Sequence, residues 1–230
     1  YGDLKAVKSL SLTIQPGEIF CMLGANGAGK TTTLMVSLGF TDPTRGTVKI
    51  CGIDVTRDPL EAKKHVAYVS ENVMLYGNFT ARQNLDFFTK LGGVKDATDQ
   101  DYKQVLKRVG LQEDAFNRRV KGFSKGMRQK LGIAIAIMKD AEVILLDEPT
   151  SGLDPKSGAE FLQLLNELRA ENKAIWMTTH DIFRAKEIAD RVGIMVAGTL
   201  VQLLTREELQ QQDLEALYVQ YVSQATEEAV

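Results

Sequence analysis

A short segment near the N-terminus has the residue types and spacing of a loop that binds phosphate groups. The pattern G-x-x-x-x-G-K-[ST] is matched at each fixed position by Gly24-Ala25-Asn26-Gly27-Ala28-Gly29-Lys30-Thr31. Glycines let the backbone approach a phosphate closely, so that main-chain N–H groups neutralise part of its charge. We expect Lys30 to bind the β- and γ-phosphates and the Thr31 hydroxyl to bind Mg²⁺. The loop predicts that the chain binds a nucleoside triphosphate, but it does not distinguish among kinases, GTPases and ATPases.

A second chemical feature is a pair of acids that ends an apolar run. Asp147 and Glu148 directly follow Val143-Ile144-Leu145-Leu146. A buried strand of this kind brings its last side chains to the sheet edge where open α/β folds bind ligands. We expect Asp147 to hold Mg²⁺ through water and Glu148 to accept a proton from an attacking water molecule. Taken alone, two acids also fit a strand that ends at the solvent boundary; the phosphate loop favours the chemical interpretation.

These residues need strands and helices to position them. Strands are predicted at residues 10–14, 18–23, 48–50, 66–69, 143–146, 174–177 and 192–196. Helices are predicted at residues 30–38, 156–170 and 181–189, across most of 80–138 with Thr80 as a helix cap, and from 205 to 230. The alternation of strands and helices is typical of a parallel sheet covered by helices, here with a helical insertion at residues 80–141.

Composition limits the partners that the chain can have. A length of 230 residues suits one well-buried domain. The formal net charge of −2 gives no sign of a nucleic-acid partner. Cys21 and Cys51 lie in apolar contexts and suggest neither a metal site nor a disulfide framework. No apolar run reaches the length of a membrane span, because the most apolar region, 131–146, contains three charged residues. Any role at a membrane is therefore expected to need a partner.

Three further segments narrow the choice among phosphate-binding proteins. Asp154 lies in a segment, Pro149 to Pro155, that begins directly after the two acids. His180 follows the predicted strand 174–177, and Phe123-Ser124-Lys125-Gly126-Met127 precedes a helical run. In this order the segments resemble those of ABC-type ATPase subunits, over nearly the whole chain. The usual signature of that family is L-S-G-G-Q, with which Ser124 and Gly126 agree and the other three residues do not.

The resemblance assigns roles to individual residues. Glu148, His180 and Lys30 are expected to be catalytic, with His180 holding the γ-phosphate. Mg²⁺ is expected to bind Thr31, Asp147 and Glu71. Ser124, at a helix N-terminus, is expected to meet a γ-phosphate held by a second subunit. The expected nucleotide contacts also include an adenine-stacking aromatic residue, and the full set is Tyr1, Gly24, Asn26, Gly27, Ala28, Gly29, Lys30, Thr31, Thr32, Ser124, Gly126 and Asp154.

Glu71 is the main departure from the family pattern. It aligns with a glutamine that the family carries between the core and the helical insertion. A glutamate still offers oxygen to Mg²⁺ or water, but it adds a negative charge near the phosphates. We expect Glu71 to keep the role of that glutamine as a sensor of the nucleotide site. The coupling between ATP turnover and the partner protein is expected to be altered.

The resemblance also implies a fold and a division of the chain. The fold is α/β, with a P-loop NTPase core and a mainly parallel sheet, an N-terminal antiparallel β subdomain and an inserted α-helical subdomain. Residues 1–230 form a single ATPase domain. Within it, residues 1–79 and 142–204 are the nucleotide-binding core, 80–141 the helical subdomain with the signature, and 205–230 a C-terminal helical tail.

The implied function is ATP binding and hydrolysis with Mg²⁺ at a head-to-tail dimer interface. The second ATPase subunit is an identical or a different chain. The cycle drives separate transmembrane subunits from the cytoplasmic face of the membrane. The signature variant resembles export-type systems, so export is expected and import is the alternative. A non-transport ABC ATPase lacks support because no long coiled coil or tandem domain is present, and a P-loop kinase would not need the signature or His180.

Overall fold

A six-stranded sheet organises the molecule in the computed structural model, which describes residues 1–227. The strand order is β4-β5-β6-β1-β7-β8, and each neighbouring pair is parallel except β7 with β8. In that order the strands are Val66–Val69, Val143–Asp147, Ala174–Thr179, Ile19–Leu23, Arg191–Val196 and Thr199–Thr205. A separate antiparallel pair, β2 (Lys49–Ile50) with β3 (Ile53–Asp54), has two residues per strand. The predicted α/β class with a mainly parallel sheet is confirmed.

The central strand β1 shows why the sheet is covered on both faces. All five of its residues are buried, as expected for a parallel strand that reads as a continuous apolar run. Alternate side chains enter two different cores. Ile19, Cys21 and Leu23 belong to the larger core, whereas Phe20 and Met22 belong to the smaller one. Burial raises the pKa of the Cys21 thiol far above its ordinary range, so this thiol stays protonated.

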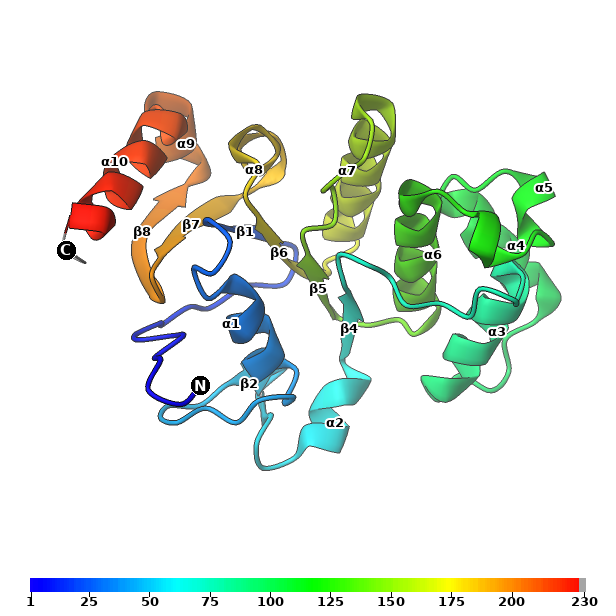
Figure 1. Cartoon of the computed structure of the whole chain (residues 1–230). Helices are drawn as coiled ribbons and strands as arrows, with labels where there is room; N and C mark the ends of the chain where they lie inside the picture. Colours follow the sequence, from blue (N-terminus) through cyan, green and yellow to red (C-terminus); the bar gives the residue numbers. More distant parts are fainter. Residues whose placement is uncertain (228–230) are drawn as a thin grey trace.

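Helices cover the two faces and extend one end of the sheet (Figure 1). The helices outside the insertion are α1 (Lys30–Ser37), α2 (Pro59–Lys64), α7 (Pro155–Ala170), α8 (Ile182–Ile188), α9 (Arg206–Gln211) and α10 (Leu214–Glu227). Between β4 and β5 the chain forms α3 (Ala81–Leu91), α4 (Asp99–Arg108), α5 (Glu113–Phe116), the 3₁₀ helix η1 (Val120–Gly122) and α6 (Lys125–Met138). These lie together beyond β4 in Figure 1, coloured green. None of the helices within residues 1–227 is both long and apolar enough to cross a membrane.

Local sequence signals mark where several of the helices begin. Thr80 accepts a hydrogen bond from the backbone N–H of Gln83, whose side chain in turn accepts one from the N–H of Thr80. This capping box satisfies two N–H groups that a helix start leaves unpaired. Ser124 caps α6 through the N–H of Met127, and Asp154 caps α7 through that of Ser157. The predicted cap at Thr80 is confirmed.

One predicted strand did not form, and two strands that form, β3 and β8, were not predicted. Residues 10–14 form no strand, although Leu10, Leu12 and Ile14 are half-buried and alternate with exposed residues as expected. They pack against the smaller core, but within residues 1–227 the one β-bridge nearby joins Ser9 to Thr199, so no ladder forms. Strand β8 was not predicted. It follows a two-residue turn at Ala197-Gly198, where both residues have positive φ, the geometry of a tight hairpin.

The C-terminal tail also differs from the expectation of a helical run from residue 205 to 230. It divides into α9 and α10, with Thr205 as the last residue of β8 and a capping residue of α9. The last part of the predicted tail, residues 228–230, lies outside the described residues.

Replacing Leu85 by alanine tests how the helical insertion is held. Leu85 on α3 is fully buried, so we expect Leu85→Ala to lower the free energy of unfolding by about 2–5 kcal/mol. Leu91, on the same helix, is 71% exposed, and Leu91→Ala should change it by about 0.5 kcal/mol or less. Urea denaturation measures both. Equal losses in the two variants would contradict the burial of this helix face.

Candidate functional site

Three neighbouring strands end at the same edge of the sheet and bring the chemical residues together. The sheet order places β6 between β5 and β1. Asp147 on β5 is in register with Thr178 on β6, and Leu23 on β1 is in register with Thr179. The loop that follows β1, the acids that end β5 and His180 after β6 therefore meet at the carboxyl edge, where ligands of open α/β sheets bind.

The loop from Gly24 to Lys30 needs its glycines for close packing. A Cβ atom at Gly24 would lie 2.6 Å from the carbonyl oxygen of Met195. At Gly29 it would lie 2.4 Å from the carbonyl oxygen of Ala6, and Gly29 has a φ of 105°. A Cβ at Gly198 would lie 2.7 Å from the same Ala6 oxygen. At these positions the neighbouring backbone lies so close to the loop that only glycine, which has no Cβ atom, fits.

Lys30 lies inside this loop with its ammonium group nearly covered. The residue is 5% exposed. Its Nζ donates to the carbonyl oxygens of Gly24 at 2.7 Å and Ala25 at 3.2 Å. The same Nζ lies 3.3 Å from Oε1 of Glu148, close enough for an ion pair although the angles are not those of a hydrogen bond. A buried cation needs such partners, so the loop and the end of β5 depend on each other.

Asp147, at the end of β5, connects helix α1 to the two strands that flank β5, which are β4 and β6. Its carboxylate accepts from the Thr31 hydroxyl at 3.1 and 3.3 Å and from the Thr178 hydroxyl at 2.6 Å. The Tyr68 hydroxyl lies 3.5 Å from Asp147 Oδ2. Burial, and then the negative charge of Asp147, raise the pKa of Tyr68 well above its ordinary value, so Tyr68 is a neutral donor at this carboxylate. Thr31 and Asp147 together supply hard oxygen ligands of the type that Mg²⁺ prefers.

Glu148 adopts a backbone conformation that few glutamates have. Its φ is +47°, in the left-handed region. Its N–H donates to the backbone oxygen and the hydroxyl of Thr178, both at 3.2 Å. Its Oε2 lies 2.8 Å from Nδ1 of His180 and also accepts the His180 N–H at 3.3 Å. Strained backbone of this kind persists where surrounding contacts hold it, often at functional sites. The strain aims the Glu148 carboxylate between Lys30 and His180.

The loop also offers backbone donors for an anion. Across residues 1–227, the N–H groups of Gly27, Gly29, Lys30 and Thr31 make no hydrogen bond. Gly29 and Lys30 stand at the start of α1, where the helix dipole favours negative charge. Asn26 is exposed at the loop tip, and Thr32 is half-buried on α1. These donors, the Lys30 ammonium and the Thr31–Asp147 oxygens fit a Mg²⁺-nucleoside triphosphate.

The signature residues lie apart from this loop in the same chain. Within the described residues, no hydrogen bond or ion pair joins Ser124, Gly126 or Asp154 to the loop. Ser124 is exposed at the start of α6. Gly126 is buried, and a Cβ there would contact Leu153 and Ser157, close to the cap of α7. One chain therefore does not bring the signature to its own loop.

Two predicted site residues have other neighbours in the structure. Glu71 was expected to bind Mg²⁺ with Thr31 and Asp147, but its Oε1 pairs with Lys125 at 3.1 Å and accepts from Ser151 at 3.2 Å. The Lys125 hydrogen bond, opposed by partial burial, lowers the pKa of Glu71. Tyr1 is 67% exposed, and its amino group bonds the carbonyl of Leu4. Metal binding by Glu71 and stacking by Tyr1 stay predictions.

Sequence reasoning missed Thr178 as a central residue of the site. It is fully buried and bonds both Asp147 and the backbone of Glu148. A usable signal was present, since two neighbouring buried strands both end in polar residues and parallel pairing places those ends side by side. The partners of Glu71 had no such signal, because they depend on how the helical insertion packs.

Comparisons with a family model, with related sequences and with solved structures all indicate the same family. A family model described as "ABC transporter" matches residues 7–151. The chain is 38% identical over 200 residues to the "ABC transporter ATP-binding protein NatA" of Bacillus subtilis (strain 168), covering 86% of this chain and 81% of that protein. It is 36% identical over 227 residues to the "Bacitracin transport ATP-binding protein BcrA" of Bacillus licheniformis, covering 97% and 72%. A dimeric ATP-binding cassette solved in a post-hydrolysis state with ADP and Pi is 27% identical, with a TM-score of 0.80, covering 88% and 91%.

Removing the Thr178 hydroxyl tests the packing of this edge. We expect Thr178→Val to lower the free energy of unfolding by about 1–3 kcal/mol, because the Asp147 carboxylate loses a buried donor. Thr178→Ser keeps the hydroxyl and loses only a methyl group, so it should cost less. Urea denaturation of both variants measures the difference. If the serine variant loses as much stability as the valine variant, the hydroxyl does not hold the carboxylate.

Proposed function

The chain belongs to the ABC transporter family of ATP-binding proteins, and from this we propose that it binds ATP and hydrolyses it to power transport through separate membrane-spanning subunits. The observation that carries the proposal is the placement of Glu148. Its strained backbone holds the carboxylate beside Lys30 and His180, one residue after the Asp147–Thr31 pair. The arrangement supplies a base, a cation and metal ligands around one reacting phosphate.

Each of these side chains has a separate task in the proposed reaction. Lys30 and the N–H groups of the loop bind and orient the phosphates. Thr31 and Asp147 would hold Mg²⁺, which supplies further charge neutralisation when bound. Glu148 accepts a proton from the attacking water molecule or polarises it. His180 contacts the γ-phosphate and positions Glu148 through Nδ1. Phosphoryl transfer to water needs this positioning and charge balance more than covalent chemistry.

We further propose that a second ATPase subunit completes the site. Ser124, Gly126 and Asp154 lie apart from the loop of their own chain, and a head-to-tail partner would bring its own copies to the nucleotide. The similar cassette with ADP and Pi is dimeric. The second subunit is either an identical chain or a related one. Closure of the dimer around ATP and reopening after hydrolysis would form the working cycle.

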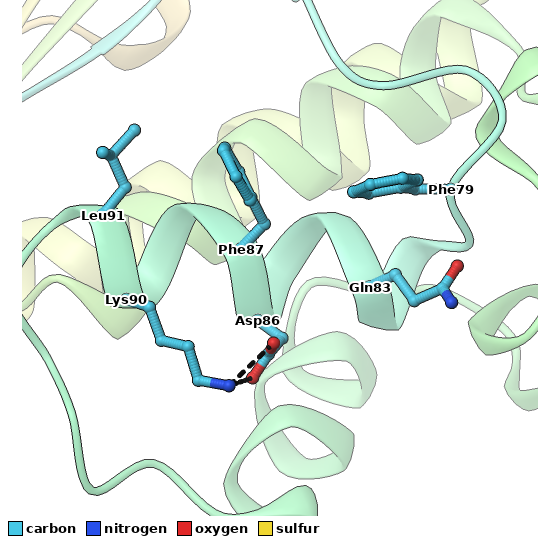
Figure 2. Close-up of a pocket in the computed structure, with 6 residues that line it drawn as sticks. All are labelled: Phe79, Gln83, Asp86, Phe87, Lys90 and Leu91. Atoms are coloured by element: carbon cyan, nitrogen blue, oxygen red, sulfur yellow. Dashed lines mark hydrogen bonds and ion pairs between the residues drawn. The ribbon is translucent and has the colours of Figure 1, made fainter.

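The transmembrane partner is proposed to dock on an exposed aromatic patch, which we define as Tyr76, Phe79, Phe87 and Phe88. Neighbouring rings lie 5.0–6.5 Å apart, in a continuous chain. Phe79 and Phe87 line a surface pocket with Leu91, which is 71% exposed. Figure 2 shows these apolar side chains beside α3, with the Lys90–Asp86 ion pair at the edge.

An exposed apolar surface of this kind usually marks an interaction site. The patch begins five residues after Glu71, so a partner seated there would touch the segment that leads back to the site. We propose that the occupant is a short helix of the transmembrane subunit, packing apolar side chains against the rings. The subunit would then work at the cytoplasmic face of the membrane, held by its partner.

Two finer points complete the proposal. The transport direction is proposed as export, supported by the resemblance of the segment Gly126-Met127-Arg128-Gln129-Lys130 to export-type systems; import is the alternative. Residues 1–79 and 142–204 are proposed as the nucleotide-binding core, 80–141 as the subdomain that carries the signature, and 205–230 as a tail.

Replacing Glu148 by glutamine tests the catalytic assignment. Glu148→Gln keeps the size of the side chain but removes its basicity, so we expect ATP binding to persist and phosphate release to fall by about 100-fold or more. ATP should then accumulate a dimer that size-exclusion chromatography detects. Glu167→Gln, on the exposed face of α7, is the matched control and should hydrolyse ATP at the parental rate. Parental turnover in Glu148→Gln would refute the role of this residue.

Replacing Phe87 by serine tests the docking surface. Phe87 contacts Tyr76 and Phe88 at the centre of the patch, so Phe87→Ser should weaken association with the membrane partner by about tenfold or more. ATP hydrolysis by the isolated subunit should stay within about twofold of the parent. Cosedimentation with membranes that contain the partner measures association. Phe40→Ser removes another exposed aromatic side chain, 62% exposed, and should bind normally; equal binding by both variants would contradict the proposed site.

A further inference from the structure

Glu71 lies where three segments from distant parts of the chain meet. It belongs to the segment between β4 and α3. Lys125 is the first residue of α6, and Ser151 lies between β5 and α7. One oxygen of Glu71, Oε1, accepts from Lys125 Nζ at 3.1 Å and from Ser151 Oγ at 3.2 Å. A single carboxylate oxygen therefore joins the signature helix, the segment before the helical insertion and the segment that follows Glu148.

Helix α6 contacts residue 71 at a second point. The side-chain amide of Gln129 donates to the backbone oxygen of Glu71 at 2.9 Å and to that of Ser70 at 3.3 Å. Gln129 and Lys125 are four residues apart on α6 and so share a helix face. Gln129 is fully buried, whereas the Lys125 and Glu71 side chains are 30% and 44% exposed. The helix thus makes a neutral, buried contact with the backbone and a charged, partly exposed contact with the side chain.

The charged contact joins two positions that both depart from the family pattern. Lys125 stands at a glycine position of the usual signature, and Glu71 stands at a glutamine position. Each change alone would add a charge that the usual family pattern lacks at that position. In the folded chain the two charges lie together and cancel. The Lys125 side chain also reaches Gly152, because a Cβ built there would lie 3.8 Å from its Cδ and Nζ.

We propose that Lys125 and Glu71 act as one positioning pair, which sets the orientation of the signature helix relative to the segment that carries the catalytic acid. Lys125 holds α6 against Glu71 through the ion pair. Glu71 in turn holds the segment after Glu148 through its hydrogen bond with Ser151. A partly exposed ion pair is weak, so the link breaks and re-forms during a cycle without holding the subunit in one state. This inference rests on the proposed ATPase function.

A double-mutant cycle tests the pair. Glu71→Gln and Lys125→Met should each lower kcat for ATP hydrolysis by about threefold to tenfold and leave KM within about twofold, and the double variant should be no slower than the worse single variant. The charge-reversed variant, Glu71→Lys with Lys125→Glu, should recover kcat to within about twofold of the parent. A lysine that only fills space would not show this recovery.

Lys130 and Glu160 provide the matched control. They form an ion pair at 2.7 Å that also starts on α6 but ends on α7, away from Glu71. Lys130→Met and Glu160→Gln should leave kcat within about twofold of the parent. Independent, multiplicative losses from Glu71→Gln and Lys125→Met would overturn the inference. A raised KM in Lys125→Met alone would also overturn it, because Lys125 would then bind nucleotide directly.

A measurement without turnover separates this inference from the proposed function. Hydrogen exchange of the backbone amides at residues 70–75 should be faster in both single variants and return to the parental rate in the charge-reversed variant. If hydrogen exchange at residues 70–75 is unchanged in the single variants, the proposed positioning role of the pair is wrong, whatever their rate of ATP hydrolysis. If the parent and Glu148→Gln hydrolyse ATP equally, the catalytic proposal fails while the exchange result still decides whether the pair positions the segment.

Discussion

A buried ammonium group is the constraint on which the rest of the site depends. Lys30 is almost fully covered, and its charge needs partners that water does not supply there. Two carbonyl oxygens of its own loop provide part of the compensation, and Glu148 provides the anion. Glu148 reaches that position only because β5 is separated from β1 by a single strand and because its own backbone turns into the left-handed region. The loop, the strand order and the strained residue thus depend on one another.

The same dependence explains why much of this site could be predicted from sequence. The phosphate loop and the acids after 143–146 are local patterns, and parallel strands bring their carboxyl ends to one edge whatever lies between them. The loop residues, Asp147, Glu148 and His180 were therefore expected together, and the structure places them together. Six of the seven predicted strands also formed, with at most small changes at their ends. In the central sheet this is expected, because buried apolar runs have few alternatives.

The unpredicted parts depend on contacts between distant segments. The alternation at residues 10–14 correctly predicted which side chains are half-buried. A strand also needs a neighbouring strand to pair with, and the sequence does not show whether one is present. Thr178 looks like an ordinary strand residue until β5 lies beside it. Glu71 was expected at the metal from the family resemblance, and nothing nearby in the chain indicated that Lys125, more than fifty residues later, would lie against it. Its partner was decided by the packing of the helical insertion.

The close approach at Ala6 has an evolutionary consequence. Gly29 in the phosphate loop and Gly198 in the β7–β8 turn both face the carbonyl oxygen of this one residue, at distances that leave no room for a methyl group. A substitution at either glycine would push against the same oxygen. Both positions are therefore expected to remain glycine in descendants of this sequence. A hairpin at the edge of the sheet, which takes no part in the chemistry, thereby inherits the selective pressure that acts on the phosphate loop.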